Sequence, residues 1–113
     1  MIGGIVGQSL GAKIQNSYNV GTVYGSGNRE EFIGGIIGRI GNRTYVYNND
    51  VLNSYNLASV GKSFVFFNGS DYKSSYACNI EESILKTYAS QLGSTFKSDN
   101  NNINDGYPIL SWQ

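Results

Sequence analysis

The residues of this chain that could perform acid–base chemistry are few and do not stand in catalytic arrangements. Its 113 residues include no histidine, which removes the usual general base, the hydrolase triads that depend on it, and imidazole metal ligands. The acidic pairs Glu30–Glu31 and Glu81–Glu82 are adjacent in sequence, whereas glycosidase carboxylates must face each other across a substrate. The second pair also stands where a helix is expected to begin, a position that favours acidic side chains. We therefore predict that the chain is not an enzyme and has no catalytic residues.

Two segments imitate ligand-binding motifs without completing them. Residues 56–63 (NLASVGKS) nearly spell a phosphate-binding loop, but Asn56 replaces its first glycine and strand-forming residues follow where a helix should open. Residues 99–106 have the composition of a calcium loop, yet Ile103 interrupts the alternation of ligands and no glutamate follows at the twelfth position. We predict a polar turn there, with weak metal binding as the alternative. No metal or cofactor is expected.

Tyrosine side chains are the remaining candidates for ligand contact. They offer a large rigid surface with a polar tip, which can stack on sugar rings or anchor a protein partner. The candidates, which packing on a strand face would explain as well, are Tyr24, Tyr45, Tyr47 and Tyr72.

The overall composition indicates a β-rich chain and excludes two classes of partner. Only 14% of the residues are charged and the net charge is zero, so binding to nucleic acid is not expected. No run approaches the roughly 18 apolar residues of a membrane span, so no membrane insertion is expected. Fifteen glycines and nine tyrosines, with many Asn and Ser, favour short strands joined by tight turns. The single cysteine, Cys78, excludes an internal disulfide.

A repeated pair of motifs dominates the first part of the chain. The heptad IGGIVGQ begins at Ile2 and its near copy IGGIIGR begins at Ile33; each is followed by NSYN, at residues 16–19 and 53–56. A weaker third copy comprises FVFFNG at residues 64–69 and SSYA at residues 74–77. The pattern divides residues 1–78 into modules at 2–32 and 33–63 and a degenerate one at 64–78, with extra residues near 41–50 that predict a loop.

Short apolar runs that recur at such a period predict stacked strands. We expect an all-β fold, specifically a short β-solenoid of about three coils that resembles a parallel β-helix. Equivalent residues of successive coils should then form columns, and the glycines should allow close backbone approach. The predicted columns are Tyr18–Tyr55–Tyr76, Asn16–Asn53 and Ser17–Ser54–Ser75.

The paired motifs resemble the GLUG repeat of bacterial extracellular and surface proteins. Residues 14–23 match the second half of that repeat closely, although Ala58 stands where a glycine is usual in the second module. Residues 92–113 are similar to the terminal segment that closes arrays of these repeats. The resemblance implies a secreted or cell-surface protein of adhesin-like or cell-wall-associated type, with no established catalytic residues.

Residues 79–113 are expected to form a C-terminal cap. Asn79 and Glu82 have the spacing of a capping box, and Gly93 is placed to end a helix that spans about residues 80–92. The apolar face of this helix comprises Ile80, Ile84, Leu85, Tyr88, Ala89 and Leu92. The tail beyond it should pack against the final coil through Phe96, Tyr107, Pro108, Ile109, Leu110 and Trp112. The first coil has no such cover, which predicts further repeats and an export signal upstream, and an edge-mediated homodimer of this fragment.

These features predict a non-catalytic bacterial cell-surface or secreted repeat module, structural or adhesin-like, at the C-terminal end of a larger protein. Its expected partner is a host or cell-surface protein or a glycan. The alternative is a carbohydrate-binding module that uses exposed Tyr or Trp side chains. Part of a polysaccharide-degrading enzyme is the least favoured reading.

Overall fold

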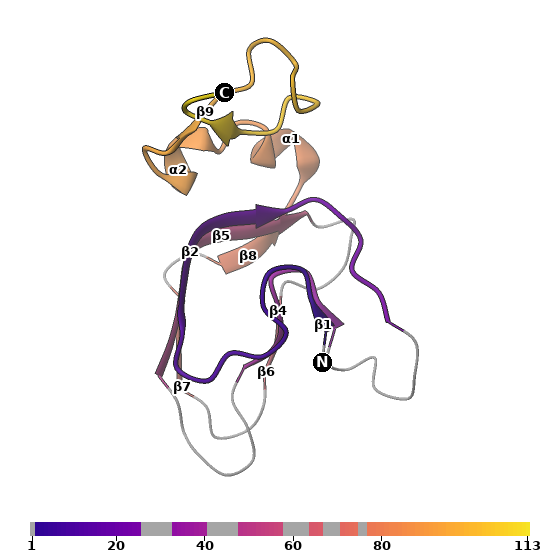
Figure 1. Ribbon diagram of the computed structural model, residues 1–113, viewed down its shortest axis with the longest axis vertical. Helices are drawn as coiled ribbons and strands as arrows, with labels where there is room; N and C mark the ends of the chain where they lie inside the picture. The colour runs from indigo at the N-terminus through magenta and orange to yellow at the C-terminus, as the bar shows by residue number, and fades with distance from the viewer. Residues whose placement is uncertain (1, 26–32, 41–47, 58–63, 67–70, 75–76) are drawn as a thin grey trace.

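The computed structural model describes residues 2–25, 33–40, 48–57, 64–66, 71–74 and 77–113. The described chain is mostly β, with parallel strands in its first part and two short helices near the C-terminus (Figure 1). Its extents of 47 × 29 × 20 Å show that the molecule is elongated.

The two glycine heptads lie side by side in register. Strand β1 (Ile2–Gly3) pairs in parallel with β3 (Ile33–Gly34), and Val6 forms a bridge to Ile37. The third copy continues the stack, because β4 (Ile37–Ile40) pairs in parallel with β6 (Phe64–Phe66). The aliphatic side chains between the strands form one hydrophobic cluster, which contains Val6, Ile14, Ile36, Ile37 and Val51.

The two NSYN segments also stack in register, which confirms the first two positions of the predicted columns. Strand β2 (Lys13–Asn19) pairs in parallel with β5 (Asn48–Leu57), so that Ser17 lies opposite Ser54 and Tyr18 lies opposite Tyr55. The predicted amide contact is present as well: Asn53 Nδ2 donates to Asn16 Oδ1 at 3.3 Å. The φ angle is positive at both residues, 53° at Asn16 and 46° at Asn53. Asparagine tolerates this conformation better than most other non-glycine residues.

The prediction for the third NSYN copy is wrong by two residues. Strands β7 (Asp71–Ser74) and β8 (Ala77–Ile80) both pair in parallel with β5, and the residue opposite Tyr55 is Cys78, not Tyr76. Likewise Ala77, not Ser75, lies opposite Ser54. This register brings Asn79 opposite Asn56 and Ile80 opposite Leu57, so amide meets amide and an aliphatic side chain extends the buried cluster. These two matches outweigh the Tyr-on-Tyr alignment that the sequence suggested.

The predicted β-solenoid of about three coils is also wrong as a description of the whole fold. The described strands form four separate short sheets and no closed coil; one sheet, β9 (Phe96–Lys97) with β10 (Ile109–Leu110), is antiparallel. Irregular repeat lengths explain this outcome, because β5 is long enough to pair with two different strands and the β4–β6 pairing shifts register between Ile37 and Ile40. We use the term rung for the described strands of one repeat: β1 and β2 form the first rung, β3 to β5 the second, and β6 to β8 the third.

Two short helices replace the single predicted helix. Helix α1 (Glu82–Leu85) ends because Thr87 N and Tyr88 N bond to carbonyls three residues back and the Thr87 hydroxyl donates to Ile84 O, so the turn tightens before α2 (Ala89–Leu92) begins. The capping box is absent, because Asn79 lies in β8 and the N-cap residue is Glu81, which makes no side-chain capping bond. Gly93 does end α2, with φ of 107°.

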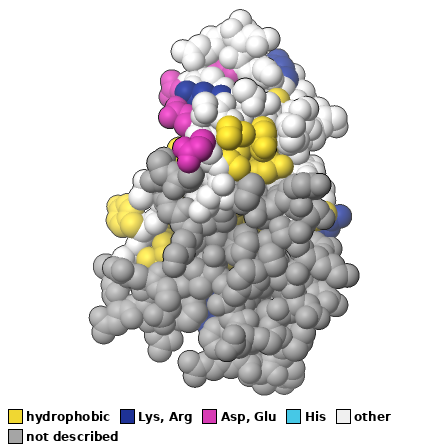
Figure 2. Space-filling view, turned by 180° about the vertical axis from the view of Figure 1, so that it is seen from behind, with side chains coloured by type: hydrophobic (Ala, Val, Ile, Leu, Met, Phe, Trp, Pro, Cys, Tyr) yellow, Lys and Arg dark blue, Asp and Glu magenta, His cyan; other side chains and the backbone are white. Residues whose placement is uncertain are grey.

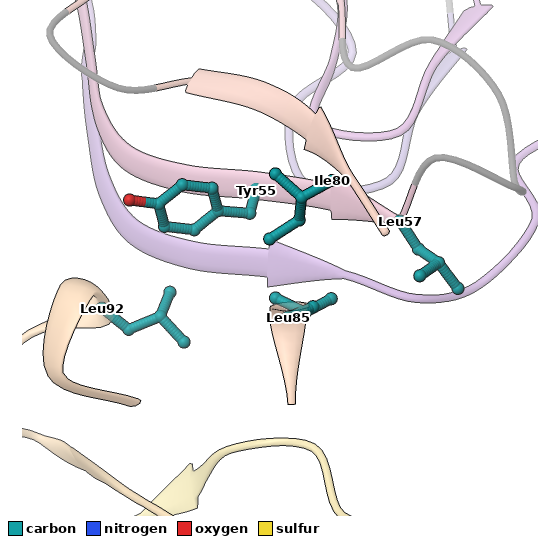
Figure 3. Packing of buried hydrophobic residues seen from close by; sticks show 5 residues of the cluster. All are labelled: Tyr55, Leu57, Ile80, Leu85 and Leu92. Atoms are coloured by element: carbon teal, nitrogen blue, oxygen red, sulfur yellow. The ribbon is translucent and has the colours of Figure 1, made fainter. Parts of the chain in front are cut away.

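The C-terminal segment (residues 81–113) covers a face of the parallel sheet instead of the edge of its last strand. In Figure 1 it lies above β2, β5 and β8. Figure 3 shows Leu85 and Leu92 on the side of the sheet where side chains of β5 and β8 are buried. The buried cluster there comprises Tyr55, Leu57, Ile80, Leu85 and Leu92. Of the predicted apolar faces, Ile84 and Trp112 are exposed instead of buried. The segment therefore clamps the rungs together from the side.

Candidate functional site

A ladder of three asparagines links the three rungs. Asn19 Nδ2 donates to Asn56 Oδ1 at 2.9 Å, and Asn56 Nδ2 donates to Asn79 Oδ1 at 3.2 Å. Asn56 also donates to Leu57 O at 3.2 Å and is completely buried. A buried amide must be hydrogen-bonded to avoid a desolvation penalty, and here the repeat supplies the partners. We did not expect this ladder from the sequence, although the final asparagine of each NSYN motif was the signal for it.

The glycine heptads leave room for this ladder. A Cβ atom on Gly35 would overlap the side-chain oxygen of Asn56. In the first rung a Cβ atom on Gly4 would lie 3.3 Å from Asn19 Oδ1 and would overlap the carbonyl of Gly35. The second glycine of each heptad thus packs against the last asparagine of the following NSYN motif. The two motifs recur together because they contact each other.

The tyrosine column faces the C-terminal segment. The Tyr18 hydroxyl donates to Pro108 O at 2.6 Å and accepts from Asn104 Nδ2 at 3.0 Å. The Tyr18 ring packs edge-on against Phe96 and is stacked with Tyr107. In the second rung, Tyr55 packs edge-on against Tyr88, with ring centroids 5.0 Å apart. These tyrosines therefore join the segment to the rungs.

The chemistry of Tyr18 matches this structural role. Burial raises the pKa of its hydroxyl, and the charges of Asp99 and Tyr107 act in the same direction, whereas the bond from Asn104 lowers it. At neutral pH the hydroxyl consequently keeps its proton and serves as a hydrogen-bond donor.

Of the predicted ligand-contacting tyrosines, Tyr24 is the one whose side chain the structure describes. Tyr24 follows the first rung and is 84% exposed. Tyr72 lies on β7, with its backbone opposite Asn49, whereas Tyr45 and Tyr47 lie outside the described residues. Trp112, which was predicted to pack in the tail, is 73% exposed. Among the described residues, Tyr24 and Trp112 are thus aromatic side chains that a ligand could reach.

The loop that resembles a calcium site closes on its own backbone. The Asp99 carboxylate accepts from the amide nitrogens of Ile103, Asn104 and Gly106 at 2.8, 2.7 and 3.0 Å. Desolvation would raise the pKa of Asp99, but these three bonds together lower it. The carboxylate thus holds a polar turn. The described residues contain no group of three His, Cys, Asp or Glu side chains that could hold a metal ion.

The charged groups of the described surface make local contacts. Lys86 Nζ lies 2.7 Å from Glu82 Oε1, one helical turn away, and 5.0 Å above the ring of Tyr107. The hydrogen bond and charge of Lys86 lower the pKa of Glu82. On the face that Figure 2 shows, acidic and basic side chains of the C-terminal segment lie near each other and form no large patch of one sign. Of the segment that resembles a phosphate-binding loop, Asn56 is held in the ladder and residues 58–63 lie outside the described chain.

The first rung presents the candidate interaction surface. Within the described chain the sheet order is β2, β5, β7, so β2 is an edge strand. Repeat-equivalent residues differ in exposure accordingly: Ile5 is 44% exposed and Ile36 is completely buried. Asn19 and Tyr18 are likewise half-buried, whereas Asn56 and Tyr55 are buried. Equivalent side chains of the repeat are therefore buried in the second rung and partly exposed to solvent in the first.

Comparison of the chain with models of protein families, with curated proteins and with solved structures gives no match. The resemblance to GLUG repeats therefore stays a prediction from the sequence. Within the described residues, no helix has the length and apolar character needed to cross a membrane.

Proposed function

We propose that this chain is a non-catalytic structural or adhesin-like repeat module. The single observation that supports this proposal best is the asparagine ladder, because it shows the repeated polar residues bonding one rung to the next. The repeated tyrosines are likewise held by the C-terminal segment, through Pro108, Phe96 and Tyr88. Because these repeated residues join neighbouring repeats, they make the module rigid. A rigid module can present its remaining surface to a partner.

The proposed location is the bacterial cell surface or the medium outside it, within a larger exported protein. This part of the proposal depends on the sequence resemblance of residues 14–23 and 92–113 to GLUG repeats and their terminal segment. The expected partner is a host or cell-surface protein or a glycan.

Antibody labelling of the source cells tests the location. Antibodies raised against the purified chain should label intact cells as strongly as permeabilised ones, or detect the chain in the culture medium, and deletion of the coding region should abolish either signal. Labelling that requires permeabilisation would contradict the proposal. Incubation of the chain with a panel of polysaccharides tests the absence of catalysis, since the release of new reducing ends would show an enzyme.

Carbohydrate binding is the second candidate function. The observation in its favour is the exposure of Tyr24 and Trp112, whose rings are accessible to a sugar face. A glycan array probed with the intact chain, and with the variants Tyr24→Ala and Trp112→Ala, tests it directly. Binding to specific glycans that either substitution abolishes would support this function. An array without any binding would contradict carbohydrate binding and leave the structural module as the proposed function.

A further inference from the structure

The bond between Asp105 and Gly106 lies in the polar turn that Asp99 closes. Of the aspartates in the sequence, Asp105 is the one that glycine follows. Asp105 is exposed, and the φ angles of Asp105 and Gly106 are positive, at 51° and 82°. Because glycine has no side chain to shield its nitrogen, the carboxyl group of a preceding aspartate can reach that nitrogen. The turn thus combines an exposed carboxyl carbon with an accessible backbone nucleophile.

The reaction open to this pair is isomerisation of the peptide link. The Gly106 nitrogen attacks the side-chain carboxyl carbon of Asp105, so that a C–N bond forms and the amide hydrogen leaves with a carboxyl hydroxyl as water. The product is a succinimide ring. Water then opens the ring at the former main-chain carbonyl, which becomes a carboxylate, and the chain continues through the Asp105 side chain. The two steps consume and release one water molecule and need no oxidant or metal.

The Asp99 carboxylate opposes the first step of this reaction. Asp99 Oδ2 accepts from Gly106 N at 3.0 Å, and the same carboxylate binds the amides of Ile103 and Asn104. The nitrogen must give up its proton to attack, and a negative charge at this distance disfavours the anionic nitrogen that would result. Asp99 is also a poor acceptor for that proton, because its three amide bonds lower its pKa. The carboxylate therefore keeps Gly106 N protonated and holds its peptide plane in the turn.

We propose that Asp105–Gly106 is a self-modification site, at which an isoaspartyl link forms slowly, and that Asp99 limits the rate as a positioning residue. This inference goes beyond the proposed function and does not depend on it, because the reaction needs only residues of the turn and water.

The modification should affect the anchor of the C-terminal segment. An isoaspartyl link adds one main-chain carbon between residues 105 and 106. Tyr107 N donates to Asn104 O at 2.9 Å across this bond, and Pro108 O accepts from the Tyr18 hydroxyl just beyond it. A longer main chain changes the spacing between these groups. Hydrogen exchange at the amides of residues 104–110 should accordingly be faster in the modified chain.

The test is incubation of the intact chain at mildly acidic pH, cleavage after lysine, and electron-transfer fragmentation of residues 98–113. An isoaspartate at residue 105 alters the fragment ions without changing the mass, whereas deamidation of the neighbouring asparagines raises the mass. The reference is the synthetic peptide SDNNNINDGYPILSWQ, which carries the same bond outside the folded chain. We expect isomerisation to be about tenfold slower in the intact chain, as one hydrogen bond to a charged group implies.

Three variants separate the charge of Asp99 from general loosening of the segment. Asp99→Asn removes the charge and should raise the rate about three- to tenfold. Tyr18→Phe loosens the segment but keeps the bonds of Asp99, so it should raise the rate less. Asp105→Glu keeps a carboxylate at the site but requires a larger ring, and should give no product.

Four results would overturn the proposal. The first is the absence of isoaspartate at residue 105 from the Asp99→Asn chain, and the second is an equal rate in the intact chain and the peptide. The third is a slower reaction in Asp99→Asn, since Asp99 would then act as the base. The fourth is equal acceleration by Asp99→Asn and Tyr18→Phe, which would assign the effect to loosening.

Discussion

The side-chain oxygen of Asn56 occupies the space that a Cβ atom on residue 35 would need. This contact joins the glycine heptad of the second module to its NSYN motif. It explains in physical terms why residue 35 is glycine, since every other residue type has a Cβ atom.

Alanine at position 35 is expected to destabilise the fold strongly. Gly35→Ala must displace the buried Asn56 amide or shift a strand, and overpacking of this kind costs about 1–3 kcal/mol. Gly21 is the matched control, because a Cβ atom there would meet nothing closer than 3.8 Å. Urea unfolding followed by circular dichroism should show a large loss for Gly35→Ala and a small change for Gly21→Ala. Equal effects would show that the close contact has no energetic importance.

The double variant Gly35→Ala/Asn56→Ala tests whether the two residues act through each other. Removing the Asn56 side chain removes the overlap, so the double variant should lose less stability than the two single losses added together. Additive losses would indicate independent effects.

The middle position of the asparagine ladder should be the most sensitive. Asn56→Ala removes three hydrogen bonds of a completely buried side chain, at about 1 kcal/mol each. Asn19→Ala also removes three hydrogen bonds, but the two with Gly21 are exposed to solvent and water can replace them, so its effect on the free energy of unfolding should be smaller. Chemical denaturation of both variants measures the difference. A larger loss for Asn19→Ala would contradict the ladder as the link between rungs.

The hydroxyl of Tyr18 should hold the C-terminal segment against the first rung. Tyr18→Phe keeps the ring contacts with Phe96 and Tyr107 but leaves the carbonyl of Pro108 without this donor, which should cost about 1–2 kcal/mol. Hydrogen exchange of the amides in residues 104–110 should accelerate. Tyr24→Phe, at an exposed position, should leave both stability and exchange unchanged. Similar behaviour of the two variants would count against the proposed anchor.

Acid should loosen the loop around Asp99. The folded pKa of this carboxylate is lowered from 3.8, so the folded state binds fewer protons than the unfolded state as the pH falls through that range. The contribution of Asp99 to stability is therefore present above pH 3.8 and disappears as the pH falls through the lower folded pKa. Asp99→Asn should be less stable than the unmodified chain at pH 7, and the difference should shrink at pH 3. A difference that is independent of pH would show that the three amide bonds do not depend on the charge.

The sequence predicted the stacking of the first two modules and missed details of the third. Two near-identical motifs, each with a heptad and NSYN, leave few registers in which like residues meet, and the pairing of Tyr18 with Tyr55 followed from that. The third copy is too degenerate for this argument. Its register was decided by contacts of Asn79 and Ile80, which the Ser-Tyr pattern of the third copy does not indicate.

The candidate sites divide in the same way. Exposed Tyr24 and the polar turn at Asp99 were visible in the sequence, because each depends on local composition. The asparagine ladder and the exposure of Trp112 were not, because they depend on which distant segments meet.

The sequence by itself determined that the chain is rich in short strands, that its repeats stack in parallel and that it lacks histidine chemistry. These properties depend on composition and on the motif pair that the first two modules share. Only the tertiary structure decided that Asn79 joins a ladder instead of capping a helix, and that the C-terminal segment covers the tyrosine face instead of the last strand. The reason is competition: one amide or one aromatic face has several possible partners in the sequence, and the non-local packing that buries most apolar surface with its polar groups paired selects one.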